Sequence, residues 1–162
     1  MATITVWLGS LNPLGTTAVV LVLAFLVGAA VGIERGMSTS SVGIRTCTLV
    51  ALASAAFADL VVRRVPDIQW GNAFGAVATG VGFLGAGAII KGSQLRRVSG
   101  LGEAGTIWCM AIVGLLLGAR EIVVALLVTA LVLAVNVLLR PVASWIDRHR
   151  ALRQPEDDVL DG

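Results

Sequence analysis

Charged residues are scarce in this sequence. Only 14% of its 162 residues are Asp, Glu, Lys or Arg, whereas 57% are hydrophobic, and the mean hydropathy is +0.92. A soluble domain has roughly 25% charged and 45–50% apolar residues. The scarcity of charge therefore argues against a soluble globular domain and favours a membrane protein. The net charge of +2 does not indicate nucleic-acid binding, because the basic residues are spread along the chain.

Histidine and cysteine are nearly absent as well. His149 is the single histidine and lies near the carboxyl terminus, and the two cysteines are Cys47 and Cys109. They do not form a metal-binding set, and we interpret the cysteines as small buried apolar residues that stay reduced. The sequence also has neither a nucleophile motif nor a carboxylate set for two-metal chemistry. We therefore expect a protein that is not an enzyme and that holds no resident metal or cofactor.

The apolar residues gather in five segments. Each is close to the ~17–25 residues that a helix needs to cross a bilayer, and none alternates as the strands of a membrane barrel do. The sequence thus predicts an all-α polytopic membrane protein, with transmembrane helices at about residues 14–33, 45–62, 73–90, 104–119 and 122–139. We expect one membrane domain over residues 1–145 and a short polar tail over residues 146–162, part of it disordered.

The basic residues between these segments predict an orientation. Nine of them fall on one side of the membrane, and the other side has three, Arg63, Arg64 and Arg120. The positive-inside rule then predicts an amino terminus outside and a carboxyl terminus in the cytoplasm. The first 13 residues carry no Lys or Arg. We therefore expect the first segment to remain as a transmembrane helix rather than to be cleaved as a signal peptide.

Glycine is concentrated in the third segment, where residues 79–87 read TGVGFLGAG. Its G-x-G-x-x-G spacing matches a dinucleotide-binding fingerprint, but that motif needs a strand before it and a helix after it in a water-soluble domain. In a bilayer, glycine instead lets two helix backbones approach closely. The candidates for close helix packing are Gly28, Gly32, Gly80, Gly82, Gly85 and Gly87. We expect Gly28 and Gly32 to pack against the third segment, and Gly82→Leu or Gly85→Leu to disrupt folding by pushing helices apart.

Charged residues interrupt the apolar pattern at the predicted cytoplasmic ends of the helices. Glu34 and Arg35 close the first segment, Arg45 and Thr46 open the second, and Glu103 opens the fourth. An ionised side chain that enters hydrocarbon needs a partner or a wet cavity. Two acids and two bases at one depth therefore predict mutual neutralisation, and interfacial charges exposed to water are the alternative.

Three further polar positions lie elsewhere in the membrane segments. Asp59, near the outer end of the second segment, is either a lone intramembrane acid or the partner of Arg63 one turn on, which we favour. Arg120 and Glu121 are expected to form a tight hairpin between the last two segments. Asn136 is a candidate for a hydrogen bond to a neighbouring helix, worth roughly 0.6–2 kcal/mol.

Four motifs follow one another at the ends of these segments. They are Gly-x-Glu-Arg at 32–35, Gly-x-Arg-Thr at 43–46, Gly-x-Gly-Phe-Leu-Gly-Ala-Gly at 80–87 and Gly-Leu-x-x-Ala-x-Thr-x-Trp at 100–108. Together they make the chain resemble the MgtC/SapB family over about residues 19–139. The resemblance implies five transmembrane helices in the bacterial inner (plasma) membrane. Many members carry a carboxyl-terminal ACT-like domain, so we expect this chain to be a short member without it.

The resemblance also implies a function. Members of the family are linked to adaptation to low magnesium and to virulence, and to regulation of other membrane machinery such as the F-type ATP synthase. The implied partners are the lipid bilayer and another membrane protein complex, with self-association left open and no nucleic acid. The alternative is a small channel or carrier for magnesium or another cation, with Glu34 and Glu103 in an inner vestibule. The functional candidates are Glu34, Arg35, Arg45, Thr46, Glu103 and Trp108.

Several positions depart from the family pattern. Asn72 and Ala76 stand where members usually have Arg and Gln, Ser99 replaces a basic residue, and Gly102 and Glu103 replace a Thr-Thr pair. These changes remove positive charge and add a negative charge at the start of the fourth helix. They bear on whether this chain keeps the partner or ligand of the family.

Overall fold

The described part of the protein is a bundle of five long helices. The computed structural model describes residues 12–37, 42–92 and 100–151. The helices are α2 (Pro13–Met37), α3 (Ile44–Arg64), α4 (Trp70–Gly92), α5 (Leu101–Gly118) and α6 (Ile122–Ala151), and a short 3-10 turn, η1 (Asp67–Gln69), precedes α4. The described residues contain no strand, and all five helices are long and apolar enough to cross a membrane. The all-α class with five spans is confirmed.

The helix boundaries follow local sequence signals. At the start of α2, the side chain of Asn12 accepts a hydrogen bond of 2.6 Å from the backbone N–H of Gly15, which is helix capping. At the end of α3, Pro66 restricts Val65 to an extended conformation, with φ −117° and ψ 136°. The indole Nε1 of Trp70 then donates to the carbonyl of Val65 at 2.9 Å. The turn between α3 and α4 is therefore short and hydrogen-bonded.

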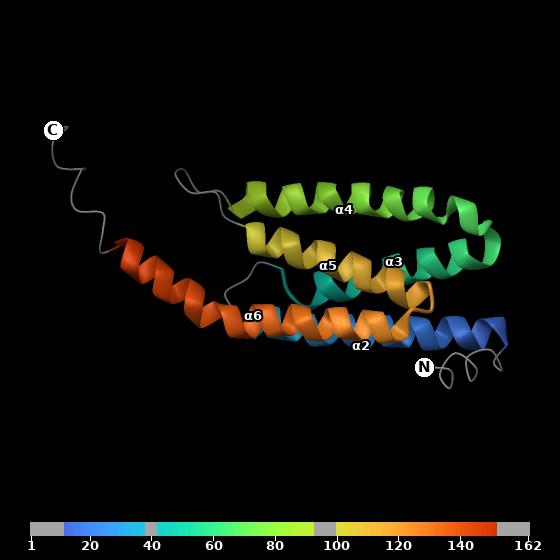
Figure 1. The fold of residues 1–162 in the computed structure, drawn as a ribbon, viewed down its shortest axis with the longest axis horizontal. Helices are drawn as coiled ribbons and strands as arrows, with labels where there is room; N and C mark the ends of the chain where they lie inside the picture. Colours follow the sequence, from blue (N-terminus) through green and yellow to red (C-terminus); the bar gives the residue numbers. More distant parts are fainter. Residues whose placement is uncertain (1–11, 38–41, 93–99, 152–162) are drawn as a thin grey trace.

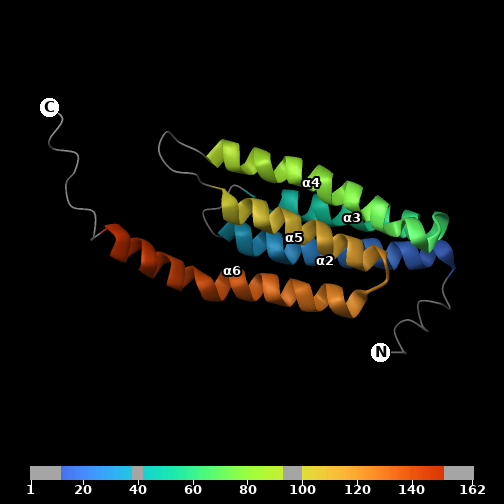
Figure 2. The same cartoon turned by 45° about the horizontal axis from the view of Figure 1, so that its top comes forward.

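Helix α5 is the centre of the bundle, because it contacts each of the other four helices. Its most extensive contact is with α3, which in turn packs along α2. Helices α4 and α6 lie at opposite edges (Figures 1 and 2). Helix α6 also reaches past the other helices and ends at Ala151, so residues 146–151 of the expected polar tail are helical. Residues 152–162 of that tail lie outside the described part.

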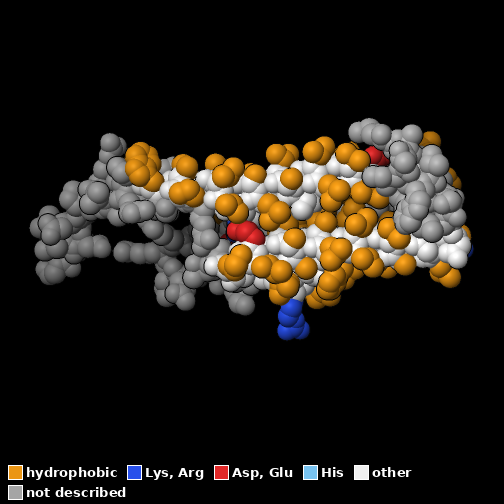
Figure 3. Space-filling view, turned by 90° about the horizontal axis from the view of Figure 1, so that it is seen from below, with side chains coloured by type: hydrophobic (Ala, Val, Ile, Leu, Met, Phe, Trp, Pro, Cys, Tyr) orange, Lys and Arg blue, Asp and Glu red, His pale blue; other side chains and the backbone are white. Residues whose placement is uncertain are grey.

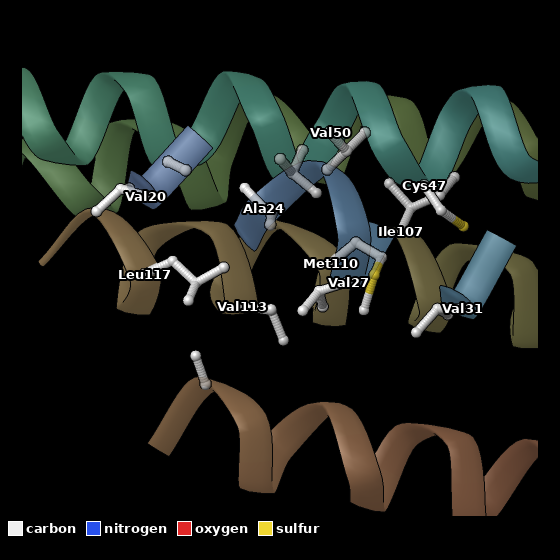
Figure 4. Packing of buried hydrophobic residues seen from close by; sticks show 14 of the residues in the cluster. Val20, Ala24, Val27, Val31, Cys47, Val50, Ile107, Met110, Val113 and Leu117 are labelled. Carbon is white, nitrogen blue, oxygen red and sulfur yellow. The ribbon is translucent and has the colours of Figure 1, made fainter. Parts of the chain in front are cut away.

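Most of the core is built from one face each of α2, α3 and α5, joined by Val81 of α4 and by Ile122 and Ala125 of α6. On α2, Val20, Ala24, Val27 and Val31 recur every three or four residues and turn toward the bundle (Figure 4). They meet Cys47 and Val50 from α3 and Ile107, Met110, Val113 and Leu117 from α5. Cys47 is fully buried and Cys109 is half-buried, and both are free thiols. The interpretation of Cys47 as a small apolar core residue is confirmed.

Glycine allows close contacts between helices of the bundle. A Cβ added to Gly28 would lie 2.7 Å from the Cα of Thr48, and one added to Gly32 would overlap the Cα of Ile44. The expectation that this pair packs against the third segment was wrong, because Thr48 and Ile44 belong to α3. Two glycines of α5 that the motifs did not single out, Gly114 and Gly118, meet the α3 backbone at Ala51 and Ala55 in the same way.

The glycine run on α4 lies differently. A Cβ on Gly85 would be 3.5 Å from the Cβ of Ala104, an ordinary contact. At Gly80, Gly82 and Gly87, a Cβ would have no heavy atom of the described residues within 4 Å, apart from its chain neighbours and the adjacent backbone of its own helix. Phe83, in the middle of the run, is 80% exposed. Val81 and Gly85 are thus buried against the bundle, whereas Gly82, Phe83 and Gly87 face away from the rest of the described chain, and α4 is the least buried of the five spans.

The outer surface of the bundle is apolar. In Figure 3 hydrophobic side chains cover most of the described surface on the face shown, and charged side chains are few. Large exposed hydrophobic residues occur on all five helices. Such a surface is stable when lipid rather than water surrounds it. The described chain therefore has the surface of a multi-pass membrane protein.

Candidate functional site

Five of the six predicted functional side chains lie at one end of the bundle. Helix α2 ends there, and α3 and α5 begin there, which brings Glu34, Arg35, Arg45, Thr46 and Glu103 to a similar depth. Gly32 contacts Ile44 at this end. We call it the Arg45 end. Trp108 lies further along α5 and is 48% exposed, so it faces outward rather than into the bundle.

The expected neutralisation at the Arg45 end is only partly found. The Nε of Arg35 lies 3.2 Å from the Oε2 of Glu34, and both side chains are largely buried, at 14% and 12% exposed. Arg45 is exposed and Glu103 is half-buried, and neither forms an ion pair within the described residues. Glu103 lies in the first turn of α5, where the helix dipole favours an anion. Glu34 and Arg35 therefore form one ion pair, and Arg45 and Glu103 each remain separate.

The backbone conformation at Gly100, in the fourth motif, requires glycine. It precedes α5 with φ +90°, a conformation that side chains other than glycine rarely adopt. A Cβ there would also overlap the carbonyl oxygen of Ala88 and lie 3.1 Å from the Cα of Ile89. Gly100 thus lets the start of α5 pass close to the end of α4, and it positions Glu103 one turn later.

A second charged cluster lies at the opposite end, around Asp59. The carboxylate of Asp59 is buried and accepts three contacts. The Nη2 atoms of Arg63 and Arg120 each lie 2.7 Å from one of its oxygens, and the Oγ1 of Thr17 donates to Oδ2 at 2.9 Å. The favoured pairing of Asp59 with Arg63 is confirmed. The cluster also ties α2, α3 and the α5–α6 turn together at one point.

The α5–α6 turn is the tight hairpin predicted at Arg120 and Glu121. The N–H of Glu121 bonds to the carbonyl of Leu116 at 2.8 Å, and that of Arg120 to Leu117 at 3.0 Å. This is a Schellman motif, in which the residue in the position of Arg120 is usually glycine because φ is positive. Arg120 has φ +71°. The side chain of Arg120 thus pairs with Asp59 although its positive φ is unfavourable for residues other than glycine.

Sequence reasoning found the Asp59–Arg63 pair but not the whole cluster. Thr17 and Arg120 are 42 and 61 residues from Asp59 in the chain, so local spacing could not connect them. One available signal was depth, because Asp59, Arg63 and Arg120 were all assigned to the same side of the membrane. A buried acid with a single arginine one turn away leaves one oxygen for a further donor, and Arg120 supplies it.

Two open grooves flank the central helices. The first lies between α3 and α4, has a volume of about 440 Å³, and is lined by Leu49, Val50, Ala53, Ser54, Phe57, Val77, Gly80, Val81 and Leu84. The second lies between α5 and α6, has a volume of about 380 Å³, and is lined by Gly102, Gly105, Thr106, Cys109, Val128, Leu131, Val132, Val135 and Asn136. The buried Nδ2 of Asn136 has no hydrogen-bond partner among the described residues, so the expected interhelical bond from it is not formed there.

The positions that depart from the family pattern do not form a cluster. Asn72 and Ala76 are exposed near the start of α4, and Gly102 is exposed beside Glu103 at the start of α5. Ser99 lies outside the described residues. Within the described part of the chain, no three His, Cys, Asp or Glu residues lie close enough together to hold a metal ion.

Comparison with known proteins identifies the family. The sequence profile of the MgtC family matches residues 21–145. The chain is 40% identical to Protein MgtC of Brucella abortus (strain 2308) over 143 residues, which cover 88% of this chain and 59% of that protein. It is 38% identical to Protein MgtC of Salmonella typhimurium (strain 14028s / SGSC 2262) over 128 residues, which cover 79% of this chain and 54% of that protein.

A third relative carries no functional name. An uncharacterized protein of Synechocystis sp. is 36% identical over 136 residues, which cover 84% of this chain and 57% of that protein. The chain thus spans little more than half the length of the curated relatives it matches. No solved structure gives a significant match.

Proposed function

This chain belongs to the MgtC family of membrane proteins, and from that premise we propose that it acts by binding another integral membrane protein rather than by conducting a solute. One observation carries the proposal. The space between α2, α3 and α5 is filled by packed apolar side chains such as Val27, Met110 and Val113. An ion or polar solute needs a path lined by water or polar groups. Because the core is packed, the apolar outer surface is the part of the molecule available for binding another protein.

Two buried hydroxyl groups support the same reading, although a third, the Oγ1 of Thr48, has no hydrogen-bond partner among the described residues. The Oγ1 of Thr106 donates to the carbonyl of Gly102 at 2.9 Å, and that of Thr129 donates to Ala125 at 2.7 Å. Each of these two hydroxyls is therefore satisfied within its own helix. Asp59 is held by two arginines and Thr17. Among the described residues, these polar groups do not line a continuous passage.

The carrier alternative has less support at the Arg45 end. A hydrated magnesium ion is usually bound through one or two carboxylates. Of the two candidate acids, Glu34 is already paired with Arg35. Of these two acids, only Glu103 lacks an ion pair in the described part of the chain, so one carboxylate at most is available to magnesium. The geometry therefore favours a protein that acts through its surface.

The biological setting is proposed from the family resemblance. We place the protein in the bacterial inner membrane with its amino terminus outside, in a non-enzymatic role linked to low magnesium and virulence. Its partner in this proposal is a membrane transport machine, with the F-type ATP synthase as the first candidate. The exposed apolar residues on all five helices give such a partner a surface to pack against.

The proposal is tested by isolating the protein with its partner. The tagged full chain is expressed at low magnesium, extracted in mild detergent, and analysed by quantitative mass spectrometry. We expect an integral membrane complex to co-purify in a fixed ratio, with ATP synthase subunits the first to be examined. Recovery of the protein with lipid alone, after cross-linking in intact membranes, would contradict the proposal.

A further inference from the structure

We propose that the groove between α3 and α4 is a phospholipid site, in which an acyl chain lies along the groove and Arg45, with Thr46, binds the phosphate of an anionic headgroup. This inference is independent of the proposed function. It assigns a ligand to Arg45 and Thr46, which belong to one of the family motifs. Arg45 forms no ion pair among the described residues.

The groove has the surface that an acyl chain requires. Its volume of about 440 Å³ falls in the range of ~300–1,000 Å³ for small-molecule sites. Leu49, Phe57 and Leu84 line its walls and are 62%, 39% and 47% exposed, so the chain itself leaves them uncovered. Gly80 has no side chain, and no described atom occupies the place of its Cβ. The groove is therefore apolar, open to the bilayer, and partly formed by a missing side chain.

The span from Arg45 to the far end of the groove matches one leaflet of a membrane. Twelve residues separate Arg45 from Phe57 on α3, which corresponds to a rise of ~18 Å in a helix. Half of a bilayer core is ~15 Å thick. If Arg45 lies at the level of the phosphates, the groove ends near the middle of the bilayer. A lipid of the leaflet at the Arg45 end therefore fits it lengthwise.

Arg45 and Thr46 are placed at the mouth of this groove. Residues three and four apart lie on neighbouring parts of a helix surface. Arg45 is four residues before Leu49, and Thr46 is four residues before Val50, and both Leu49 and Val50 line the groove. The guanidinium group and the hydroxyl group thus stand one helical turn beyond the apolar walls, at the depth where a headgroup begins.

The charge at this mouth favours an anion. The first turn of α3 contains no acidic residue, and its N-cap, Gly43, supplies no side-chain hydrogen bond. The N–H groups of its first turn and the helix dipole therefore attract negative charge. Arg45 adds a full positive charge and can make two parallel hydrogen bonds to a phosphate. Of the two acids at this end, Glu34 is neutralised by Arg35, and Glu103 lies in the first turn of α5, outside the helix pair that forms the groove. An anionic phospholipid complements both the charged mouth and the apolar groove.

The proposal is tested by native mass spectrometry of the full chain in detergent, titrated with phosphatidylglycerol or phosphatidylcholine. We expect one phosphatidylglycerol per chain to be retained, and Arg45→Gln to weaken its binding about tenfold, since a charged hydrogen bond to phosphate is lost. The matched control is Arg64→Gln, an exposed arginine at the other end of the same helix, which should leave binding unchanged.

Filling the groove tests the acyl-chain half of the proposal. Gly80→Leu and Ala53→Trp each place a side chain in the groove, at positions that are exposed in the chain and therefore tolerate it. Circular dichroism and thermal unfolding verify that both variants fold. We expect both to lose the bound lipid while Arg45 is unchanged. Loss in at least one folded variant is required by the proposal.

Four results would overturn it. The first is equal lipid retention by Arg45→Gln and Arg64→Gln, and the second is equal binding of phosphatidylcholine and phosphatidylglycerol. The third is binding of inorganic phosphate alone that survives in Gly80→Leu, which would mean a free-anion site. The fourth is a cross-link between two chains, or to a partner protein, through a cysteine at Ala53, because the groove would then hold a helix instead of a lipid.

Discussion

At the residue scale, the sharpest feature is a single buried carboxylate with two arginines. Asp59 is fully buried, while Arg63 and Arg120 keep 33% and 26% of their side chains exposed. A buried acid is costly without partners and is stabilised when its oxygens are all engaged. Here each oxygen has an arginine and one also has the hydroxyl of Thr17. The cluster therefore fixes the relative positions of α2, α3 and the α5–α6 turn.

Removing the Asp59 charge should loosen that end of the bundle. Asp59→Asn leaves two arginines without their acid, and breaking a buried pair costs ~3–5 kcal/mol. Because both guanidinium groups are partly exposed and regain solvent, we expect a smaller loss, about 2–3 kcal/mol. Thermal and denaturant unfolding in detergent measure it. Glu121→Gln, at an exposed position near the same end, is the control and should change little. Equal stability of both variants would contradict a stabilising role for the Asp59 cluster.

Arg120 carries two opposing effects that substitution can separate. Its positive φ disfavours a side chain by ~1–2 kcal/mol, but its guanidinium pairs with Asp59. Arg120→Ala keeps the strain and loses the pair, whereas Arg120→Gly loses both. We therefore expect Arg120→Gly to be more stable than Arg120→Ala by about 1 kcal/mol, with both below the parent. Chemical unfolding of the two variants side by side would reveal a reversed order.

At the scale of the elements, the helices were predictable and their partners were not. Long uncharged segments must form helices in a bilayer, because every backbone group has to be hydrogen-bonded internally. All five spans follow from that requirement. Hydropathy does not tell which face of a helix meets another helix, since lipid is as apolar as a protein core. The sequence therefore assigned Gly28 and Gly32 to the wrong neighbour and overlooked Gly114.

The glycines on α5 and α4 provide a direct contrast. Gly114→Leu should prevent close packing of α3 and α5, because even a Cβ there overlaps the carbonyl of Ala51. Overpacking of this kind costs ~1–3 kcal/mol or more. Gly82→Leu should leave the yield and melting temperature in detergent unchanged, since no described atom of another helix lies within 4 Å of the added Cβ. Loss of folding in Gly82→Leu would support the packing role first predicted for it.

The charged ends show the same division between what sequence predicts and what packing decides. Glu34, Arg35, Arg45 and Glu103 were placed at one end of the bundle from helix boundaries alone. Their pairing depends on side-chain direction, which sequence spacing does not give. The structure pairs Glu34 with the adjacent Arg35 and leaves Arg45 on the surface. This arrangement makes Arg45, rather than the acids, the group able to meet a ligand from the membrane.

At the scale of the whole molecule, the other four described helices pack around α5. Helices α2, α3 and α5 form a packed core, and α4 and α6 lie at its two edges with open grooves beside them. The core is held by close glycine contacts and by the Asp59 cluster. The less buried α4 and the grooves are left for lipid or another protein. A compact core with an available surface is the arrangement expected of a protein that acts on a partner.

The most direct test of this account is ion flux through the purified full chain in sealed liposomes. Magnesium, potassium and proton movement are each measured against empty liposomes, because the account predicts that the packed core conducts none of them. The parent, Glu34→Gln, Glu103→Gln and the control Glu121→Gln should all give the same flat traces. Specific flux in the parent that is lost in Glu34→Gln or Glu103→Gln, but kept in Glu121→Gln, would contradict the account and establish a channel or carrier.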